Sequence, residues 1–501
     1  MKNKILIICS ALVLLLCSGC NDWLDINRDP NALETVPDAK VLLPAVEVGI
    51  ANNLMGWDFG FGGGFWVQYW TQAYTASQFK ALCEYLPNGF NTAYISLMRE
   101  PLMDLKRMKD MTEADANRGY YFVAEALSIF TWQVVTDVWG DMPYKETLQG
   151  YDNFSPKQDK GEDIYADLMV RINALLAEDL SKSYIDATYD FIYEGDLEQW
   201  YQFANALKLK LMLRLSETSQ YNNATVLAFI ESADILTASA KIPGKTWEDG
   251  KEGKRHPMRE FQAGDANYLS QNVRGCKSFV DYLAVNGDPR LAKLFSGTKG
   301  AFFGDFDSRQ DSDGNGTTDD KETYCTAVFA GNMDLMIMSD WEVNFYIAEV
   351  YARAGNALAK DYYEAGVKAS LTQQGISNFS IIETEGYAEW QDGTVEEKIK
   401  QIAMQKWVAN CNYQHIESFL ERNRTKYPSV NEIDIKANRS SAFVNFPVGD
   451  LTISVNGRAL LGGNLPAAPL YPDAYIMRNT NAPSQKPNVG QKVWWNVKSG
   501  K

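Results

Sequence analysis

The segment that decides the fold class is Asp196–Ser216, which reads DLEQWYQFANALKLKLMLRLS. Its apolar residues recur every three or four positions, which is the spacing of one face of an α-helix. Leu209 and Leu213 form a second apolar face. Because a helix with two apolar faces must be covered on both, we expect this helix to lie between neighbouring helices in an α-helical protein.

Further helices are predicted on both sides of this segment. Ala116–Trp139 has an apolar face at helical spacing and stops before a glycine. Ser339–Ala354 begins with a capping box, and the amphipathic segment Leu358–Leu371 follows it at once. These two segments together have the length of one tetratricopeptide-like hairpin. A second capping box, Thr394–Glu397, opens another helix.

Two parts of the chain lack this helical periodicity. A loop-rich insertion covers about 242–334, and the last 74 residues hold seven of the 17 prolines. We expect irregular structure with a few short strands in the C-terminal part, because proline interrupts helices. The sequence therefore predicts a mainly α protein of tetratricopeptide-like helical pairs, forming one helical domain over 38–501.

The first 19 residues have the pattern of a lipoprotein signal peptide. Two lysines precede the apolar run Ile5–Leu16, and the small residues Ser18 and Gly19 stand directly before Cys20. The run is roughly half of the ~20 residues that a membrane-spanning helix needs. We predict cleavage after residue 19, lipidation of Cys20 and a polar tether over 20–37. An ordinary cleaved signal with an incidental cysteine is the alternative.

Charge and composition narrow the classes of function. The 501-residue chain has a net charge of −16, so it lacks the basic face that binding to nucleic acid requires. It has two histidines, His256 and His415, which argues against a histidine metal cluster and leaves one of these two for any Ser-His-Asp triad. The motifs of serine hydrolases, zinc peptidases and nucleotide-binding loops do not occur. Paired carboxylates of a glycoside hydrolase stay open, because nothing selects two of the 64 acidic residues.

Besides the lipidated Cys20, four cysteines remain after the predicted cleavage, and they lie far apart in the sequence: Cys83, Cys276, Cys325 and Cys411. These four cysteines include no C-x-x-C pair, so the sequence indicates neither a zinc knuckle nor a compact disulfide scaffold. We expect buried free thiols, with two disulfides as the alternative.

Five stretches resemble the SusD/RagB family of outer-membrane lipoproteins, in the branch called SusD-like type two. Trp139–Tyr144 resembles the W-G-D-x-P-Y signature, and Trp200–Ser216 resembles the W-x-x-F-A-N-x-L-K-x-R helix, with Lys210 where arginine is usual. The other stretches are Asp288–Leu291, Ser339–Gly355 with Ala348 and Glu349, and Gln405–Trp407 followed by Glu421–Arg424, where Asn423 separates two arginines. The resemblance extends from Cys20 to near Pro472.

This resemblance implies a helical fold of tetratricopeptide-like pairs, anchored by lipid at the outer surface of the outer membrane. It also implies a lid on a SusC-like, TonB-dependent barrel that imports glycans or, in some members, peptides. We therefore predict a glycan-binding lipoprotein, not an enzyme, that captures oligosaccharide and delivers it to the barrel. Three other functions stay open: a surface glycoside hydrolase, a peptide-binding RagB-like lid, and a helical scaffold without a small ligand.

A calcium loop is predicted from spacing alone, independently of the family resemblance. Residues 311–322, DSDGNGTTDDKE, meet the pattern D-x-[DN]-x-[DN]-G-x5-E in full. Oxygen atoms at alternate positions and a bidentate glutamate at the twelfth can surround a Ca²⁺ ion. The metal ligands that we predict are Asp311, Asp313, Asn315, Thr317, Asp319 and Glu322. A solvated acidic loop is the alternative.

Aromatic residues near the N-terminal end are the predicted ligand contacts. A helix resuming at Phe65 would place Trp66, Trp70 and Tyr74 on one face. Indole and phenol rings can stack on the apolar face of a pyranose, although aromatic residues at helical spacing more often pack in a core. The predicted ligand-binding residues are Trp57, Trp66, Tyr69, Trp70, Tyr74 and Trp247, with Gln68, Gln72 or Asn53 as partners for sugar hydroxyls and Trp390 as a comparable candidate.

Overall fold

The computed structural model describes residues 38–74, 76–265, 267–305, 323–437, 441–442 and 445–501. Its helices are α2 Leu43–Leu54, α3 Gly62–Trp66, α4 Lys80–Cys83, α5 Asn91–Leu97, α6 Met103–Thr112, α7 Gly119–Trp139, α8 Gly161–Leu175, α9 Leu197–Arg214, α10 Asn223–Ile230, α11 Pro257–Ala263, α12 Tyr268–Asn272, α13 Lys277–Val285, α14 Leu291–Leu294, α15 Asp340–Arg353, α16 Leu358–Gln373, α17 Val395–Asn410, α18 His415–Thr425 and α20 Asp473–Arg478. The strands are β1 Trp70–Gln72, β2 Met142–Pro143, β3 Gln158–Asp159, β4 Ala240–Ile242, β5 Val273–Gly275, β6 Leu335–Met338, β7 Val430–Asn431 and β8 Leu451–Thr452.

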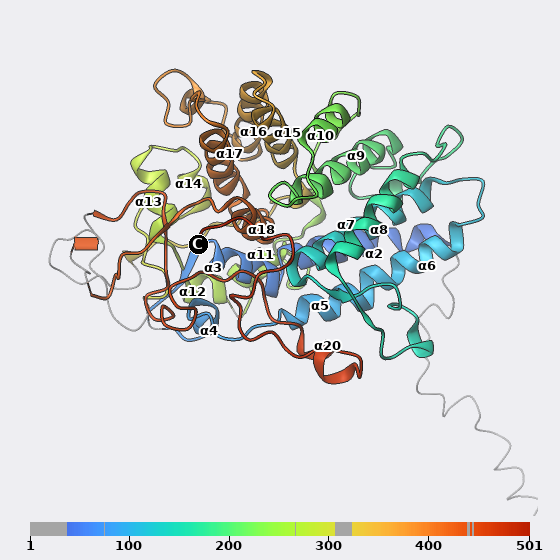
Figure 1. Ribbon diagram of the computed structural model, residues 1–501, viewed down its shortest axis with the longest axis horizontal. Helices are drawn as coiled ribbons and strands as arrows, with labels where there is room; N and C mark the ends of the chain where they lie inside the picture. Colours follow the sequence, from blue (N-terminus) through green and yellow to red (C-terminus); the bar gives the residue numbers. More distant parts are fainter. Residues whose placement is uncertain (1–37, 75, 266, 306–322, 438–440, 443–444) are drawn as a thin grey trace, which may run out of the picture.

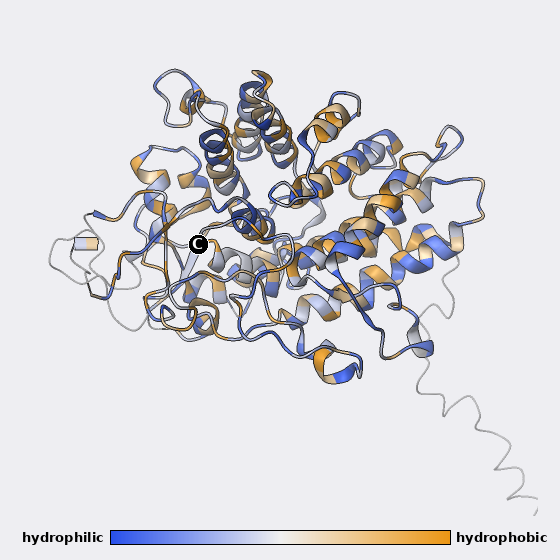
Figure 2. Ribbon diagram, viewed as in Figure 1, coloured by the Kyte–Doolittle hydropathy of each residue, from blue (hydrophilic) through white to orange (hydrophobic). Residues whose placement is uncertain are grey.

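The long helices form a continuous stack. Each helix from α6 to α10 packs on the next, α9 and α10 pack on α15, and α15 packs on α16 and α17 (Figure 1). Hydrophobic and hydrophilic residues alternate along these helices, as expected of helices that pack on one another (Figure 2). The prediction of a mainly α protein with tetratricopeptide-like pairs is confirmed, and α15 with α16 is the predicted hairpin, turning at Gly355 (φ +67°).

The two capping boxes differ in the structure. At α17, the Thr394 hydroxyl accepts from the N–H of Glu397, and the Glu397 carboxylate accepts from the N–H of Thr394. At α15, Ser339 accepts from the N–H of Glu342, but the Glu342 carboxylate turns into the core and pairs with Lys210 at 2.8 Å. At α15, the Glu342 carboxylate therefore joins this helix to the helix of Lys210 instead of completing the capping box.

Of the two predicted loop-rich regions, the insertion contains more regular secondary structure than expected. The insertion carries the short helices α11 to α14, and β4 pairs with β6 to bring its two ends together. Another antiparallel pair, β1 with β5, joins the insertion to the N-terminal part of the chain. The C-terminal segment, red in Figure 1, runs mostly as irregular chain around α20. Of the helices in the described part of the chain, none is long and apolar enough to cross a membrane.

The helix predicted from Phe65 to Tyr74 is wrong. The glycine-rich segment before Phe65 is helical, first as a π-helical turn over Trp57–Phe61 and then as α3. The chain then leaves the helix, Gln68 takes a positive φ of 60°, and β1 follows. The reason is tertiary, because a Cβ at Gly63 would lie 2.6 Å from the carbonyl carbon of His415. Glycine lets α3 lie directly against the start of α18.

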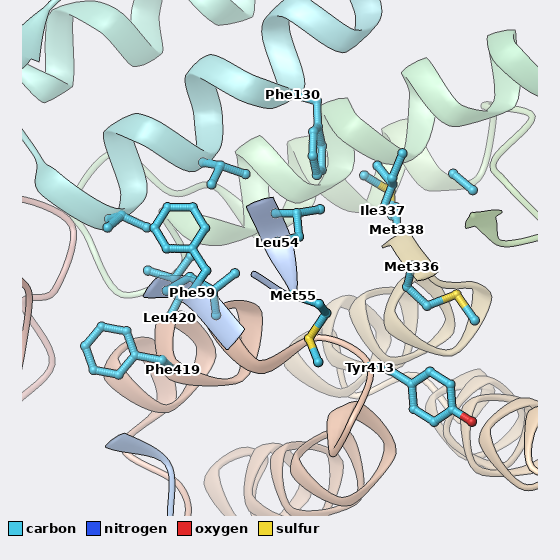
Figure 3. Packing of buried hydrophobic residues seen from close by; sticks show 14 of the residues in the cluster. Leu54, Met55, Phe59, Phe130, Met336, Ile337, Met338, Tyr413, Phe419 and Leu420 are labelled. Atoms are coloured by element: carbon cyan, nitrogen blue, oxygen red, sulfur yellow. The ribbon is translucent and has the colours of Figure 1, made fainter. Parts of the chain in front are cut away.

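One large apolar core fills the space between these layers. Figure 3 shows where side chains from α2, the π-helical turn, α7, β6 and α18 meet. The labelled residues are Leu54, Met55, Phe59, Phe130, Met336, Ile337, Met338, Tyr413, Phe419 and Leu420. Elements far apart in the sequence therefore share one core, which fixes the insertion and the C-terminal segment on the helical stack.

A buried ionic network joins five helices of the stack. Its cations are Lys210, Arg214, Lys406 and Arg424, and its acids are Asp137, Glu342, Glu349, Glu417 and Glu421. Arg424 donates two hydrogen bonds to Glu349, at 2.7 and 2.6 Å, and further ones to Glu421. Burial alone would raise the pKa of Glu349, but Arg424 and Arg353 hold it at about 2. The cations of the network also lower the pKa of Glu417 and of Glu421, so these two acids and Glu349 are held in the charged, paired state.

Candidate functional site

Three partly exposed aromatic rings lie together on the side of the insertion, and we call them the aromatic shelf: Trp57, Phe261 and Tyr268. The Trp57 ring centroid lies 5.6 Å from that of Phe261 and 5.8 Å from that of Tyr268. Tyr74 is also partly exposed, and it follows β1, whose partner β5 directly follows the helix of Tyr268. Two distant segments of the chain thus supply one aromatic surface.

The shelf rests on a stacked pair of core rings. Phe61 and Phe79 lie parallel at 4.6 Å, and each has its centroid within 5.5 Å of Trp57. Gly60 lets α11 come close, because a Cβ there would lie 2.2 Å from the methyl carbon of Met258. The shelf is therefore held in place by packing beneath it.

A polar rim borders the shelf along the loop before α11 and on α11 itself. Arg259 donates to Asp249 at 2.9 Å, and Arg255 donates to Glu260 at 2.9 Å. Hydrogen bonding to Arg259 lowers the pKa of the exposed Asp249 carboxyl. Rings that stack on an apolar face, bordered by charged donors and acceptors, suit a sugar, which has apolar C–H faces and hydroxyl edges.

Three of the predicted ligand contacts lie in the core instead. Trp66, Tyr69 and Trp70 are at most 2% exposed. The Trp66 indole donates to the carbonyl of Leu82, and the Tyr69 hydroxyl lies 2.6 Å from that of Ser418. These rings pack against the start of α18 and have no surface to offer a sugar, so for them the structure favours the core alternative.

The amides proposed as hydrogen-bond partners for a sugar are also used within the fold. Gln68 accepts from the N–H of Thr452 and from Ser278, and Gln72 accepts from the N–H of Phe79. Asn53 donates to the carbonyl of Gly49 and to Ser96. They hold the N-terminal segment to its neighbours.

Trp247 is partly exposed and contacts the start of α11 and the chain before β6. Its indole N–H donates to the carbonyl of Met333 at 2.9 Å, and its ring stands on edge to His256. Met333 lines a cavity of about 480 Å³ that also contains Asn332, Asp334, Gln373, Gln374 and Tyr413. Both amide atoms of Gln374 are buried without a hydrogen-bond partner among the described residues. Trp390 is partly buried against Tyr363, with 5.1 Å between ring centroids.

Sequence reasoning missed Phe261 and Tyr268. Both occur in the predicted insertion, and only their aromatic character could have marked them. The predicted calcium ligands and Cys20 lie outside the described residues. Within the described part of the chain, no group of three or more histidine, cysteine, aspartate or glutamate side chains is arranged to hold a metal ion.

Both histidines and the four cysteines that the structure describes are buried. Burial lowers the pKa of His256 to about 3 and that of His415 to about 4, so both rings are neutral. His256 accepts from the N–H of Met258, and the two ring nitrogens of His415 contact the carbonyl of Gly60 and the N–H of Asn412. The four cysteines predicted to be buried free thiols are so: Cys83, Cys276, Cys325 and Cys411.

Comparison with known proteins supports one family. The model of the SusD-like family described as "starch-binding associating with outer membrane" matches residues 30–446. A solved SusD homologue from Bacteroides uniformis has 20% identity and a TM-score of 0.68, over 91% of this chain and 99% of its own. A chitin-binding SusD homologue from Flavobacterium johnsoniae has 18% identity and a TM-score of 0.69, over the same shares.

A SusD homologue from Bacteroides thetaiotaomicron has 19% identity and a TM-score of 0.65, over 91% of this chain and 99% of its own. None of the curated proteins matches the chain. These structures share the helical fold, and the family model covers well over half of the sequence. The chain therefore belongs to the SusD-like family, whose members are described as starch-binding and associating with the outer membrane.

Proposed function

We propose that this protein is a cell-surface binding protein for oligosaccharides, with the aromatic shelf as its main contact surface. The observation that carries the proposal is the shelf itself, in which Trp57, Phe261 and Tyr268 stand partly exposed on rings that fix their positions. An indole can stack its apolar ring face on a sugar while its N–H stays in contact with water. The family description and the chitin-binding name of one solved relative agree with a glycan ligand.

The same proposal includes delivery. A lipid on Cys20 would tether the protein to the outer membrane, and a SusC-like, TonB-dependent barrel would receive the ligand. The support is the lipoprotein pattern of residues 1–20 together with membership of the SusD-like family.

We further propose that the protein does no chemistry on its ligand. A glycoside hydrolase needs two carboxyl groups on either side of the bond, one of them protonated at working pH. Glu47 and Asp190 form one carboxyl pair in which burial and Asp190 raise the pKa of Glu47, but both residues are at most 1% exposed. Backbone N–H groups of Phe191 and Ile192 occupy the two carboxyl groups, so the pair faces the interior.

An array of glycans and peptides, probed with purified protein, tests the proposal. The expected result is binding to a set of related oligosaccharides without release of shorter products. Binding to peptides alone would favour the RagB-like alternative, and turnover that is lost in acidic point variants would favour a hydrolase. Absence of any hit, together with co-purification with a barrel, would favour a scaffold.

A further inference from the structure

The cavity of about 480 Å³ that Met333 lines is a candidate site of its own, and we call it the amide cavity. It lies between α14, the chain that enters β6 and the end of α16. Its volume is within the range of small-ligand sites, and its lining contains none of the shelf residues. The polar side chains in the lining are Lys293, Asn332, Asp334, Gln373, Gln374 and Tyr413.

Gln374 is the member of this lining that lacks hydrogen bonds. It is 9% exposed, and neither its Nε2 nor its Oε1 has a hydrogen-bond partner among the described residues. Its main-chain N–H donates to the carbonyl of Leu371 at 3.1 Å as the cap of α16, and Gly375 follows with a positive φ of 70°. The backbone therefore fixes where this side chain starts. Because a buried amide without hydrogen bonds is unfavourable, a ligand that supplies them gains affinity.

The neighbouring residue Gln373 is, by contrast, held within the fold. It donates to Asp334 at 3.0 Å, and Asp334 also accepts from Lys241 at 2.6 Å and from the N–H of Gly244 at 2.7 Å. Burial alone would raise the pKa of Asp334, but the hydrogen bonds from Lys241 and Gln373 lower it. The carboxylate is therefore charged, and Lys241 compensates its charge. A cavity with a compensated charge favours a neutral ligand, since an added charge would have no partner.

The other polar side chains are arranged by depth. Tyr413 is 7% exposed, and burial raises the pKa of its hydroxyl, which therefore keeps its proton. Lys293 and Asn332 are exposed at the mouth, where water screens the lysine charge. Deep in the cavity, the lining thus offers neutral hydrogen-bonding groups beside the apolar side chains of Leu294 and Met333.

We infer that the amide cavity binds a neutral sugar unit through two adjacent hydroxyl groups. A primary amide carries a donor and an acceptor side by side, and two neighbouring sugar hydroxyls match them. The Nε2 of Gln374 donates to one hydroxyl oxygen, and its Oε1 accepts from the next hydroxyl. Leu294 and Met333 contact the C–H groups of the sugar ring. The inference goes beyond the proposed function, because this site uses no shelf residue and binds a single sugar unit by itself.

Ligand-observed NMR titrations of the purified protein test the inference with methyl glycosides of glucose, galactose, mannose and N-acetylglucosamine. Methyl glucuronide is the charged comparison, and N-acetyl-trialanine amide is the peptide comparison. We expect saturable binding of at least one neutral glycoside, tighter than that of the glucuronide and of the peptide. Saturable binding of none of the glycosides would overturn the inference, and so would tighter binding of the peptide or of the glucuronide.

Gln374→Met tests the role of the amide. Methionine keeps most of the side-chain length and removes both the donor and the acceptor, so glycoside binding should weaken by about tenfold or more. The melting temperature should stay the same or rise, because the wild-type amide has no partner in the described part of the fold. Gln220→Met, at an exposed glutamine, is the matched control and should bind like the wild type. Wild-type glycoside affinity in Gln374→Met would overturn the inference.

Two further variants separate this cavity from the shelf. Ala330→Trp, at an exposed position in the lining, narrows the cavity without removing a polar group and should also weaken glycoside binding. Trp57→Ala should leave the affinity for the methyl glycoside unchanged. Binding that is lost in Trp57→Ala but kept in Gln374→Met and Ala330→Trp would place the sugar on the shelf. That result would overturn this inference and leave the proposed function standing.

Discussion

Replacement of Arg214 by methionine should destabilise the protein strongly. Its guanidinium is 1% exposed and donates to Asp137 at 2.8 Å, to Glu417 at 2.7 Å and to Glu421 at 2.7 Å. These acids come from α7 and α18, so one side chain of α9 holds two other helices. Methionine keeps most of the apolar stem and removes the charge, which isolates the electrostatic part of the change.

The size of the loss in stability depends on which partners each of the three acids keeps when Arg214 is replaced. Glu417 retains Lys210 at 2.9 Å, and Glu421 retains Arg424 at 2.8 Å. Asp137 loses its ion-pair partner and keeps only the hydroxyl of Tyr165 and an amide of Gln133 as donors. Breaking a buried ion pair by removing one partner costs about 3–5 kcal/mol, and we expect a loss in the free energy of unfolding within this range.

Asp137 also gives the loss a pH dependence. Burial already raises its pKa, although Arg214 opposes the rise. Without Arg214 the folded-state pKa rises further, so folding then requires that Asp137 hold a proton that the unfolded chain releases. The destabilisation should therefore be larger at pH 8 than at pH 5.

Urea unfolding followed by tryptophan fluorescence measures both effects. Addition of Asp137→Asn to the Arg214→Met variant should recover part of the loss, because it removes the unpaired charge. Lys245→Met is the control, since its exposed pair with Glu194 contributes at most about 1 kcal/mol. A loss below about 1 kcal/mol for Arg214→Met would refute the structural role of the network, since it would lie within the range of an exposed pair.

Three further predictions concern the pH dependence of stability, the predicted calcium loop and the predicted lipid anchor. Burial and Asp190 raise the pKa of Glu47, so the wild type loses stability as the pH rises above the pKa of this group in the unfolded chain. Relative to the wild type, Glu47→Gln should therefore be more stable at pH 8 than at pH 5. Urea unfolding that gives the same difference in stability at both pH values contradicts this. The wild type should bind one Ca²⁺ with an affinity on the order of 10⁻⁴ M in calorimetry, and uptake undiminished by joint Asp311→Ala and Glu322→Ala replacement would disprove the calcium loop. Metabolic palmitate labelling should disappear in Cys20→Ala, and labelling that persists would show that the anchor is elsewhere.

The helical stack could be predicted from sequence because its signals are local. Asp196 caps α9 as its place before the apolar run suggests, with hydrogen bonds from the N–H groups of Glu198 and Gln199. The stretches that resemble the SusD/RagB family turn out to be structural. Lys210 and Arg214 belong to the buried network, where they join α9 to neighbouring helices.

The residues around Phe65 could not be predicted because their conformation depends on a distant segment. Helical periodicity places Trp66 and Trp70 on one face, but α3 ends at Trp66 because it lies against His415, about 350 residues later in the chain. The glycines that would weaken an isolated helix are what allow this approach. A single sequence gives no sign of that contact.

The aromatic shelf could be predicted only in part for a similar reason. Trp57 could be predicted as an aromatic residue among glycines, but Phe261 and Tyr268 lie about 200 residues further on. The pairing of β1 with β5 brings these parts together. No periodicity within either segment indicates that pairing.

The most direct test of the account is the affinity of Trp57→Ala for the oligosaccharide found on the array. Tyr184→Ala, at an aromatic residue that is 67% exposed, is the matched control. Loss of one stacking ring should weaken binding by about tenfold, from the ~0.5–1.5 kcal/mol of ring contact plus lost apolar area, while Tyr184→Ala should bind like the wild type. Wild-type affinity in a folded Trp57→Ala protein would show that the glycan binds elsewhere and would contradict the central claim.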